Sequence, residues 1–349
     1  MAGGGRPLRV VVVGAGAMGM SWLRVVDRHP ETELVGLADL DERRARGAAI
    51  RLRRKDLAVA GDLAGLLPLH PDACVNVTPP AAHHDVTAAA LRAGIPVLSE
   101  KPFATTIGEA LDLDALAHDR GRLLMVAQSR SYQPGLLQLR GLLDRAGPLG
   151  LVTCEFRRAY RQAGFRLTMS HPLLLDMAIH AFDAVRRVTG AQPVAVYAVQ
   201  FNPPGSWFTG DAAATVVVEF SDGVHFTYTG SWCAPGFETS WSGNWRFSGA
   251  RGTVVWDGVA PPRAELDPES APVPQLSGVD SAADVDDPLA QLQPVLDDFV
   301  AALRTGGTPW GASSDNLFTF AVALAAIESA RTGTRVEIDK VLGPHRQAV

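Results

Sequence analysis

Lysine is scarce in this sequence. Of the 32 lysine and arginine side chains, only Lys55, Lys101 and Lys340 are lysines. Arginine stays protonated at any working pH, whereas a lysine ammonium can change its pKa and share a proton when it is partly buried. The lysine kept in Glu100-Lys101-Pro102 is therefore a candidate for proton chemistry. The alternative is that one of three lysines falls in this loop by chance.

Cysteines, long apolar runs and basic clusters are also few or missing. The three cysteines include no CxxC pair, which argues against a disulfide framework or a zinc knuckle. A formal net charge of −5 without a polybasic block gives no sign of nucleic-acid binding, and no apolar run is long enough for a membrane span. The first residues lack the apolar stretch and cleavage site of a signal peptide, so we expect a cytoplasmic protein.

At 349 residues the chain is long enough for two domains. In residues 1–130, short apolar runs alternate with helical patterns, beginning with Leu8–Val13 and ending with Leu123–Ala127. Strands that alternate with helices are typical of a parallel, doubly wound α/β sheet. We therefore predict a first domain of this class over residues 1–130.

After residue 130 the pattern changes. Successive apolar runs from Leu149–Tyr160 to Thr253–Asp257, joined by turn signals, favour an antiparallel sheet, and Leu173–Thr189 predicts a helix. Residues 260–288 are rich in Pro, Asp and Ser and predict a long surface loop, after which two helices follow. We predict an α+β domain over residues 131–349, with C-terminal helices that can pack back on the first domain.

A glycine-rich loop joins the first strand to the first helix. The pattern is Gly14-x-Gly16-x-x-Gly19, and an acidic residue, Asp39, stands 20 positions after the last glycine. In this context the pattern predicts a dinucleotide site, in which the glycines allow a tight turn and a close approach of the pyrophosphate. Asp39 would bind a ribose 2′-hydroxyl and favours NAD over NADP, although Arg43 and Arg44 leave NADP open.

Asp176 and His180 stand four residues apart in an apolar helical segment and would project from one face. Histidine is the usual general acid or base near neutral pH, and a carboxylate one turn earlier can orient it or bind a substrate hydroxyl. The alternative is a helix-terminal Asp and a core His.

Five segments, in this order, together resemble the glucose-fructose oxidoreductase/inositol dehydrogenase/rhizopine-catabolism (Gfo/Idh/MocA) family. They are the GAGAMG loop, Val77-Thr78-Pro79-Pro80-Ala-Ala-His83, Gly94-Ile-Pro-Val-Leu-Ser-Glu100-Lys101-Pro102, Asp176-Met-Ala-Ile-His180, and the tail from Ala325 to Val336. The resemblance covers almost the whole chain.

The resemblance implies a Rossmann domain followed by an α+β domain with a large, open, mostly antiparallel sheet, through which homodimers or homotetramers form. It implies hydride transfer between a nicotinamide and a hydroxyl-bearing carbon of a sugar, inositol or related polyol, with no metal. Lys101, Asp176 and His180 fall on the catalytic positions. The cofactor contacts it implies are Gly14, Gly16, Ala17, Met18, Gly19, Asp39, Thr78, Pro79, His83, Glu100 and Lys101.

Substrate contacts are less well indicated. Arg157, Tyr160 and Arg166 precede the Asp176 helix and suit a polar or anionic substrate, and His171 is a further candidate. Each of these also fits a purely structural or surface role. Two other functions stay open: an NAD-dependent enzyme of the same family that cleaves glycosides, and a nucleotide-bound sugar sensor without catalysis.

Overall fold

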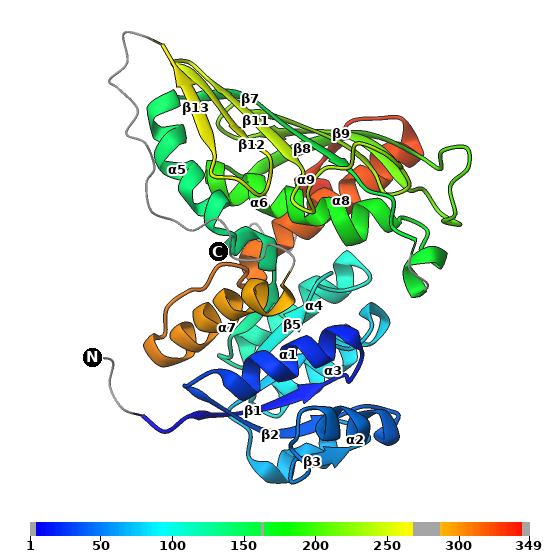
Figure 1. Ribbon diagram of the computed structural model, residues 1–349, viewed down its shortest axis with the longest axis vertical. Helices are drawn as coiled ribbons and strands as arrows, with labels where there is room; N and C mark the ends of the chain where they lie inside the picture. Colours follow the sequence, from blue (N-terminus) through cyan, green and yellow to red (C-terminus); the bar gives the residue numbers. More distant parts are fainter. Residues whose placement is uncertain (1–4, 162–163, 268–286, 344–349) are drawn as a thin grey trace. The chain divides into compact units, whose positions relative to one another are not determined.

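The computed structural model describes residues 5–161, 164–267 and 287–343 (Figure 1). Contacts divide the chain into two compact units. Unit 1 comprises residues 1–129 and 284–317, and unit 2 comprises residues 130–283 and 318–349. Among the residues that the structure describes, no helix is long and apolar enough to cross a membrane.

Unit 1 contains a six-stranded parallel sheet with the strand order β3-β2-β1-β4-β5-β6. The strands are β1 (Leu8–Val13), β2 (Thr32–Ala38), β3 (Ala58–Ala60), β4 (Ala73–Asn76), β5 (Val97–Glu100) and β6 (Leu124–Ala127). The helices between them are α1 (Ala17–Arg28), α2 (Glu42–Arg51), α3 (His83–Arg92) and α4 (Ile107–Asp119), with short 3₁₀ turns at Ala64–Leu69 and Pro80–Ala82. This is the predicted doubly wound sheet. Sequence patterns missed β3, because three residues of Ala-Val-Ala give no strand signal.

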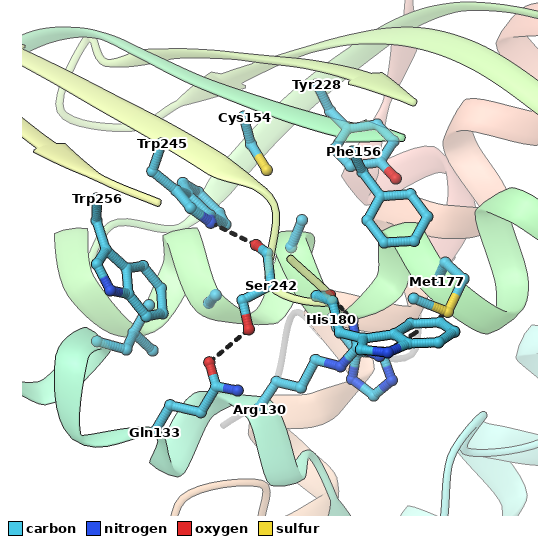
Figure 2. A pocket seen from close by; sticks show the side chains of 14 residues that line it. Arg130, Gln133, Cys154, Phe156, Met177, His180, Tyr228, Ser242, Trp245 and Trp256 are labelled. Atoms are coloured by element: carbon cyan, nitrogen blue, oxygen red, sulfur yellow. Dashed lines mark hydrogen bonds between the residues drawn. The ribbon is translucent and has the colours of Figure 1, made fainter. Parts of the chain in front are cut away.

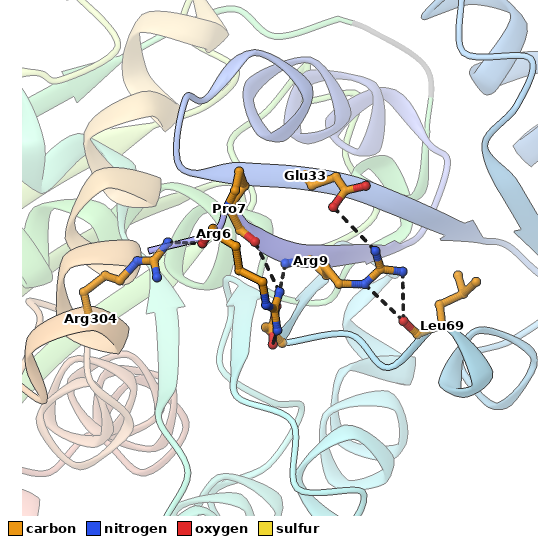
Figure 3. Close-up of polar contacts among 7 residues, drawn as sticks. Arg6, Pro7, Arg9, Glu33, Leu69 and Arg304 are labelled. Carbon is orange, nitrogen blue, oxygen red and sulfur yellow. Dashed lines mark hydrogen bonds and ion pairs between the residues drawn. The ribbon is translucent and has the colours of Figure 1, made fainter. Parts of the chain in front are cut away.

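A late segment of the chain completes unit 1. Helix α7 (Pro288–Thr305) packs on α1, and Nε2 of His29 lies 3.0 Å from Oδ1 of Asp297. At its other end the Arg304 guanidinium donates a hydrogen bond of 2.6 Å to the carbonyl oxygen of Arg6, beside the first strand (Figure 3). The Arg9 guanidinium, shown in the same view, donates to the carbonyl oxygen of Leu69. These bonds attach α7 and the loop before β4 to the start of the sheet.

Unit 2 contains an eight-stranded sheet with the order β13-β12-β11-β7-β10-β9-β8-β14. Its strands are β7 (Leu149–Arg157), β8 (Pro193–Phe201), β9 (Ala213–Phe220), β10 (His225–Ser231), β11 (Asn244–Gly249), β12 (Gly252–Trp256), β13 (Arg263–Leu266) and β14 (Val336–Glu337). Every pair is antiparallel except β7 with β10. The fold class, a Rossmann sheet followed by a mostly antiparallel sheet, is therefore confirmed.

The helices of unit 2 cover one face of this sheet. They include α5 (Pro134–Ala146), α6 (Ile179–Thr189) and α9 (Ile338–Leu342), and α8 (Ser313–Thr332) runs from the range of unit 1 into that of unit 2. Helix α5 contacts β11, β12 and β13. Because side chains alternate along a strand, Cys154 and Phe156 of β7 are buried on the helix-covered face, whereas Thr153 and Glu155 lie on the other face.

Two predictions about unit 2 were wrong in detail. The expected loop over residues 260–288 contains strand β13, which pairs with β12, and residues 268–286 of that loop lie outside the described part. The expected single helix over Leu173–Thr189 begins as a π-helix, Leu173–Ala178, before α6. Nothing in a run of apolar residues distinguishes the wider π turn from an α turn.

Candidate active site

The glycine-rich loop has the geometry of a nucleotide-binding turn. Gly14 has φ +113°, and a Cβ on it would lie 2.5 Å from the carbonyl oxygen of Val77. A Cβ on Gly19 would lie 2.2 Å from the carbonyl oxygen of Gly14, so helix and strand pack too closely for a side chain there. Gly16, by contrast, is exposed and has no heavy atom within 4 Å of a Cβ built on it. Such an open cradle before a helix suits a pyrophosphate.

The first turn of α1 extends this cradle. Ala17 and Met18 are exposed at the helix N-terminus, and no side chain caps it at Gly16. Backbone N–H groups and the positive end of the helix dipole therefore face outward, which favours an anionic group. The residues present fit a dinucleotide.

The Asp39 carboxylate closes the same loop at the end of β2. Its Oδ2 accepts a hydrogen bond of 2.9 Å from the backbone of Ala15, and its Oδ1 accepts one of 2.9 Å from the backbone of Asp41. The carboxylate is thus fixed beside the glycine loop. The Arg44 guanidinium lies 3.4 Å from Oδ1 of Asp39, and Arg43 is almost fully exposed.

Hydrogen bonds within the segment after β4 hold it in place. Asn76 accepts hydrogen bonds from the backbone and the hydroxyl of Thr78, and Pro79 is exposed. His83 is buried, with Nε2 at 2.8 Å from the carbonyl oxygen of Thr78 and Nδ1 at 2.8 Å from that of Pro102. His83 therefore joins two loops at the carboxyl ends of the parallel strands, the edge where open α/β sheets bind ligands.

Lys101 follows β5 at this edge. The Glu100 carboxylate accepts a hydrogen bond of 2.8 Å from the Trp22 indole and one of 3.1 Å from the backbone N–H of Lys101. The loop that carries Lys101 is held by Glu100 on one side and by the His83–Pro102 contact on the other. The structure thus gives Glu100 and His83 supporting contacts, and direct contact of either with a cofactor stays a prediction.

In unit 2, Asp176 and His180 lie on the consecutive π and α segments and are both buried. Oδ2 of Asp176 accepts a hydrogen bond of 2.6 Å from Nε of Arg166, and the side chain of Asp176 is only 7% exposed. Arg166 comes from a 3₁₀ turn, Phe165–Thr168. The sequence suggested Arg166 as a contact for a polar or anionic substrate and did not predict this ion pair.

His180 lines a pocket beneath the sheet of unit 2 (Figure 2). The pocket is mostly apolar, with Phe156 and Met177 in its wall, and Arg130 also lines it. The Arg130 guanidinium donates to the carbonyl oxygen of Trp241, a further lining residue, and lies 5.7 Å from the centre of the Trp241 ring. The imidazole of His180 thus lies among mostly apolar side chains, with the Arg130 guanidinium in the same lining.

The structure separates the other predicted substrate residues. The Tyr160 ring stacks on Trp232 at 5.0 Å and meets the edge of Trp241 at 6.3 Å, so Tyr160 adjoins a residue of the pocket. His171 instead accepts a hydrogen bond of 2.9 Å from the Gln200 side chain. Arg157 lines a hollow on the opposite face of the sheet and pairs with Glu155. The structure therefore does not bring Arg157 to the His180 pocket.

Sequence reasoning missed Arg130. The signal available for Arg130 was its position just after the predicted strand Leu123–Ala127, at the carboxyl end of that strand. Trp241 lies in an irregular loop before β11, where no periodic pattern indicates which way a side chain points.

Two sequence profiles of one family match the chain. The profile described as "Oxidoreductase family, NAD-binding Rossmann fold" matches residues 8–128, and that of the GFO/IDH/MocA C-terminal domain matches residues 137–255. Inositol 2-dehydrogenase 4 of Saccharopolyspora erythraea is 32% identical over 231 residues, 64% of this chain and 66% of that protein. The rhizopine catabolism protein MocA of Rhizobium meliloti is 29% identical over 335 residues, 92% of this chain and 94% of that protein.

Among solved structures, an oxidoreductase from Agrobacterium radiobacter, crystallised with NAD+, L-tartaric acid and magnesium, has the same fold. The TM-score is 0.84 at 19% identity, and the match covers 95% of this chain and 99% of that one. The glycine loop with its fixed Asp39 and the two matched profiles define an NAD-binding oxidoreductase. The chain belongs to the Gfo/Idh/MocA family of these enzymes.

Proposed function

We propose that the protein transfers a hydride between NAD and a hydroxyl-bearing carbon of a sugar, an inositol or a related polyol. The observation that carries this proposal is the Asp39 carboxylate, which the backbone of Ala15 fixes against the open cradle at Gly16. A fixed carboxylate there suits the two ribose hydroxyls of NAD and repels the 2′-phosphate of NADP. The names of relatives, among them inositol and UDP-N-acetylglucosamine dehydrogenases, support this substrate class.

NAD, when bound, supplies the nicotinamide carbon that accepts the hydride. Gly14, Gly16 and Gly19 would shape the loop for its pyrophosphate, and Asp39 would bind its ribose. In the direction of oxidation His180 takes the proton of the substrate hydroxyl, and the carbon gives up its hydride. The Lys101 ammonium would donate a hydrogen bond to the same oxygen and stabilise the charge that develops on it.

Asp176 completes this set of catalytic residues. As an ionised carboxylate it accepts a hydrogen bond from a second substrate hydroxyl and favours the protonated form of His180 after the proton transfer. In the direction of reduction the same groups act in reverse, and His180 returns the proton. Lys101, Asp176 and His180 thus supply both the proton transfer and the electrostatic stabilisation that hydride transfer from an alcohol requires.

The test is to incubate the purified protein with NAD or NADP and a panel of sugars, inositols and sugar acids, and to follow nicotinamide absorbance. We expect reduction of NAD with at least one polyol, and its loss in Lys101→Ala and His180→Ala. Cleavage of a glycoside without net reduction of added NAD would instead identify the glycosidase chemistry found in some relatives. If no substrate is changed and both variants behave like the parent, the proposal fails.

We further propose that copies of this chain associate through the face of the unit 2 sheet that the helices leave uncovered. On that face the apolar side chains of Tyr197, Val199 and Phe201 are 47%, 50% and 50% exposed. An apolar strand surface of this kind is stabilised when it is covered. We also propose a cytoplasmic location, which the three free, buried cysteines support.

A further inference from the structure

An ion pair holds the buried carboxylate of Asp176 in place. Nε of Arg166 donates to Oδ2 of Asp176 at 2.6 Å, within the range of charge-assisted hydrogen bonds. The two residues belong to different segments, the 3₁₀ turn Phe165–Thr168 and the π-helix Leu173–Ala178. The pair therefore ties the loop before the helix to the residue that we propose as a substrate ligand.

The surroundings of Asp176 make this partner necessary. Leu173, Leu174 and Ala178 of the same segment have no exposed surface, and the Asp176 side chain is 7% exposed. An ionised carboxylate in such surroundings is far less stable than in water unless a cation and hydrogen bonds compensate it. Ion pairs that are exposed to solvent contribute little to stability, but in this pair the carboxylate is shielded from solvent. Arg166 is thus a cation that compensates the charge of the buried Asp176 carboxylate.

Arg166 is itself held in one position. Its guanidinium carbon lies 4.9 Å from the centre of the Phe165 ring. Burial lowers the pKa of Arg166, but the charge and hydrogen bond of Asp176, followed by those of Tyr160, outweigh burial and raise it overall. Tyr160 in turn stacks on Trp232. A cation fixed from several sides can orient its partner, whereas a mobile surface arginine cannot.

We propose that Arg166 is a positioning residue for the oxidoreductase reaction, acting through Asp176. Since Nε of Arg166 fixes one carboxylate oxygen, the plane of the carboxylate and the direction of its second oxygen are set before substrate binds. Arg166 contacts this carboxylate from the preceding segment, and Tyr160 in turn bonds to Arg166. His180 follows one turn later, on the next helical segment. Arg166 contributes no proton and touches no reacting atom.

The loss of a positioning arginine affects the orientation and charge of its partner, whereas the loss of a structural arginine affects stability. Without Arg166 the carboxylate can rotate, which turns its second oxygen away from the substrate. It can also take up a proton, which replaces a hydrogen-bond acceptor with an O–H donor. Arg166 is not among the predicted cofactor contacts, so we expect NAD binding to be unchanged. A lysine in this position keeps the charge but lacks the planar fork of donors, so it replaces arginine only in part. Free guanidinium ion supplies both the charge and the planar donors, so it can replace the missing side chain in Arg166→Ala.

The inference rests on the proposed function, so the parent is assayed first, with a polyol that it turns over. We expect Arg166→Ala to lower kcat/KM by about 10- to 100-fold while the affinity for NAD stays unchanged. Millimolar guanidinium chloride should raise the kcat/KM of Arg166→Ala several-fold, whereas sodium chloride at the same concentration should not. Arg166→Lys should fall between the parent and Arg166→Ala. Parent-like kinetics in Arg166→Ala would overturn the inference.

A double-mutant cycle separates positioning from structure. In an Asp176→Ala background, Arg166→Ala should cause no further loss of kcat/KM, because its partner is already gone. Equal losses in both backgrounds would mean that Arg166 acts elsewhere, and the inference would fall. Arg161→Ala is the matched control, since Arg161 lies five residues before Arg166 and its guanidinium carbon packs 3.9 Å from the centre of the Trp207 ring. It should leave the kinetics as in the parent.

If the parent turns over no polyol, the proposed function fails by itself. The coupling between the two residues is then measured in unfolding experiments with the same four proteins. Non-additive losses of stability would support the orienting contact, and additive losses would overturn it.

Discussion

Nδ1 of His83 lies 2.8 Å from the carbonyl oxygen of Pro102, which is 19 residues further along the chain. The other ring nitrogen is as close to the carbonyl oxygen of Thr78. This one buried ring therefore joins the loop after β4 to the loop that carries Lys101. The two loops, where we propose that the cofactor binds, are held by a group whose protonation depends on pH.

The first prediction concerns this pH dependence. Burial lowers the pKa of His83 below its ordinary value, and the two carbonyl oxygens only partly oppose this. The unfolded chain therefore takes up a proton near pH 6.5, before the folded protein does, and stability falls as the pH drops below about 6.5. We expect His83→Gln to be less stable than the parent by about 1–3 kcal/mol at pH 8, with the difference shrinking towards pH 5 in denaturant unfolding curves.

The adjacent histidine is the control. The hydrogen bond that the His84 ring donates to the Asp112 carboxylate raises the pKa of His84 and outweighs partial burial, and Asp85 adds to this. A raised pKa stabilises the folded state below pH 6.5, and this gain is lost as the pH rises above it. The difference between parent and His84→Gln should therefore grow towards low pH. Parallel pH profiles for the two variants would contradict the assignment.

The second prediction distinguishes two glycines of the nucleotide loop. Gly14→Ala should destabilise the protein by about 2 kcal/mol or more, because its φ is +113° and the new Cβ would lie 2.5 Å from a carbonyl oxygen. Gly16→Ala should fold with parent-like stability, since its Cβ would meet no atom within 4 Å. Its methyl group would occupy the cradle, so NAD affinity should fall by about tenfold or more. Melting temperature and NAD titration measure the two effects separately.

The third prediction concerns the choice of cofactor. Asp39→Ala removes the carboxylate that the Ala15 backbone fixes beside the loop, so it should weaken NAD binding more than NADP binding. Arg44→Ala, which removes the guanidinium 3.4 Å away, should weaken NADP more than NAD. Titration of each cofactor against each variant measures both ratios. An unchanged ratio in Asp39→Ala would refute the ribose assignment.

The fourth prediction tests the proton transfer. His180→Ala should lower kcat by about 10²- to 10⁴-fold, the usual contribution of a positioned general acid or base. Its dissociation constant for NAD should stay as in the parent, because His180 is not among the predicted cofactor contacts. The matched control is His171→Ala, whose imidazole bonds to Gln200 and which we expect to retain most of its activity. A parent-like kcat in His180→Ala would exclude it as the base.

The fifth prediction concerns assembly. Val199→Arg places a charge in the centre of the uncovered apolar strand surface on β8, and it should shift the protein towards a smaller species in light scattering. Thr215→Arg is the paired position on β9 and should act in the same direction. Substitution of an exposed arginine outside the sheet, such as Arg46→Glu on α2, should leave the size of the species unchanged. A monomeric parent would disprove association through this face.

Much of the fold followed from local chemistry. Strands β1 and β6 are short apolar runs, and the predicted ranges Leu8–Val13 and Leu123–Ala127 agree with them within one residue. The glycine spacing also predicted the nucleotide turn, because only glycine tolerates the φ of Gly14 and the close approach at Gly19. Such features depend on residues adjacent in the chain, and a sequence displays them directly.

What the sequence by itself determined, then, is the doubly wound first half, the mostly antiparallel second sheet, the cofactor loop and the residue types of the proposed chemistry. The tertiary structure decided which partners these residues have. The Arg166–Asp176 pair, the His83 ring between two carbonyl oxygens, and the placing of Arg157 on the opposite face from His180 all depend on packing between separate segments. Each of these contacts joins residues that are apart in the sequence and close in the folded chain. Neither composition nor periodicity gives the distance between such residues.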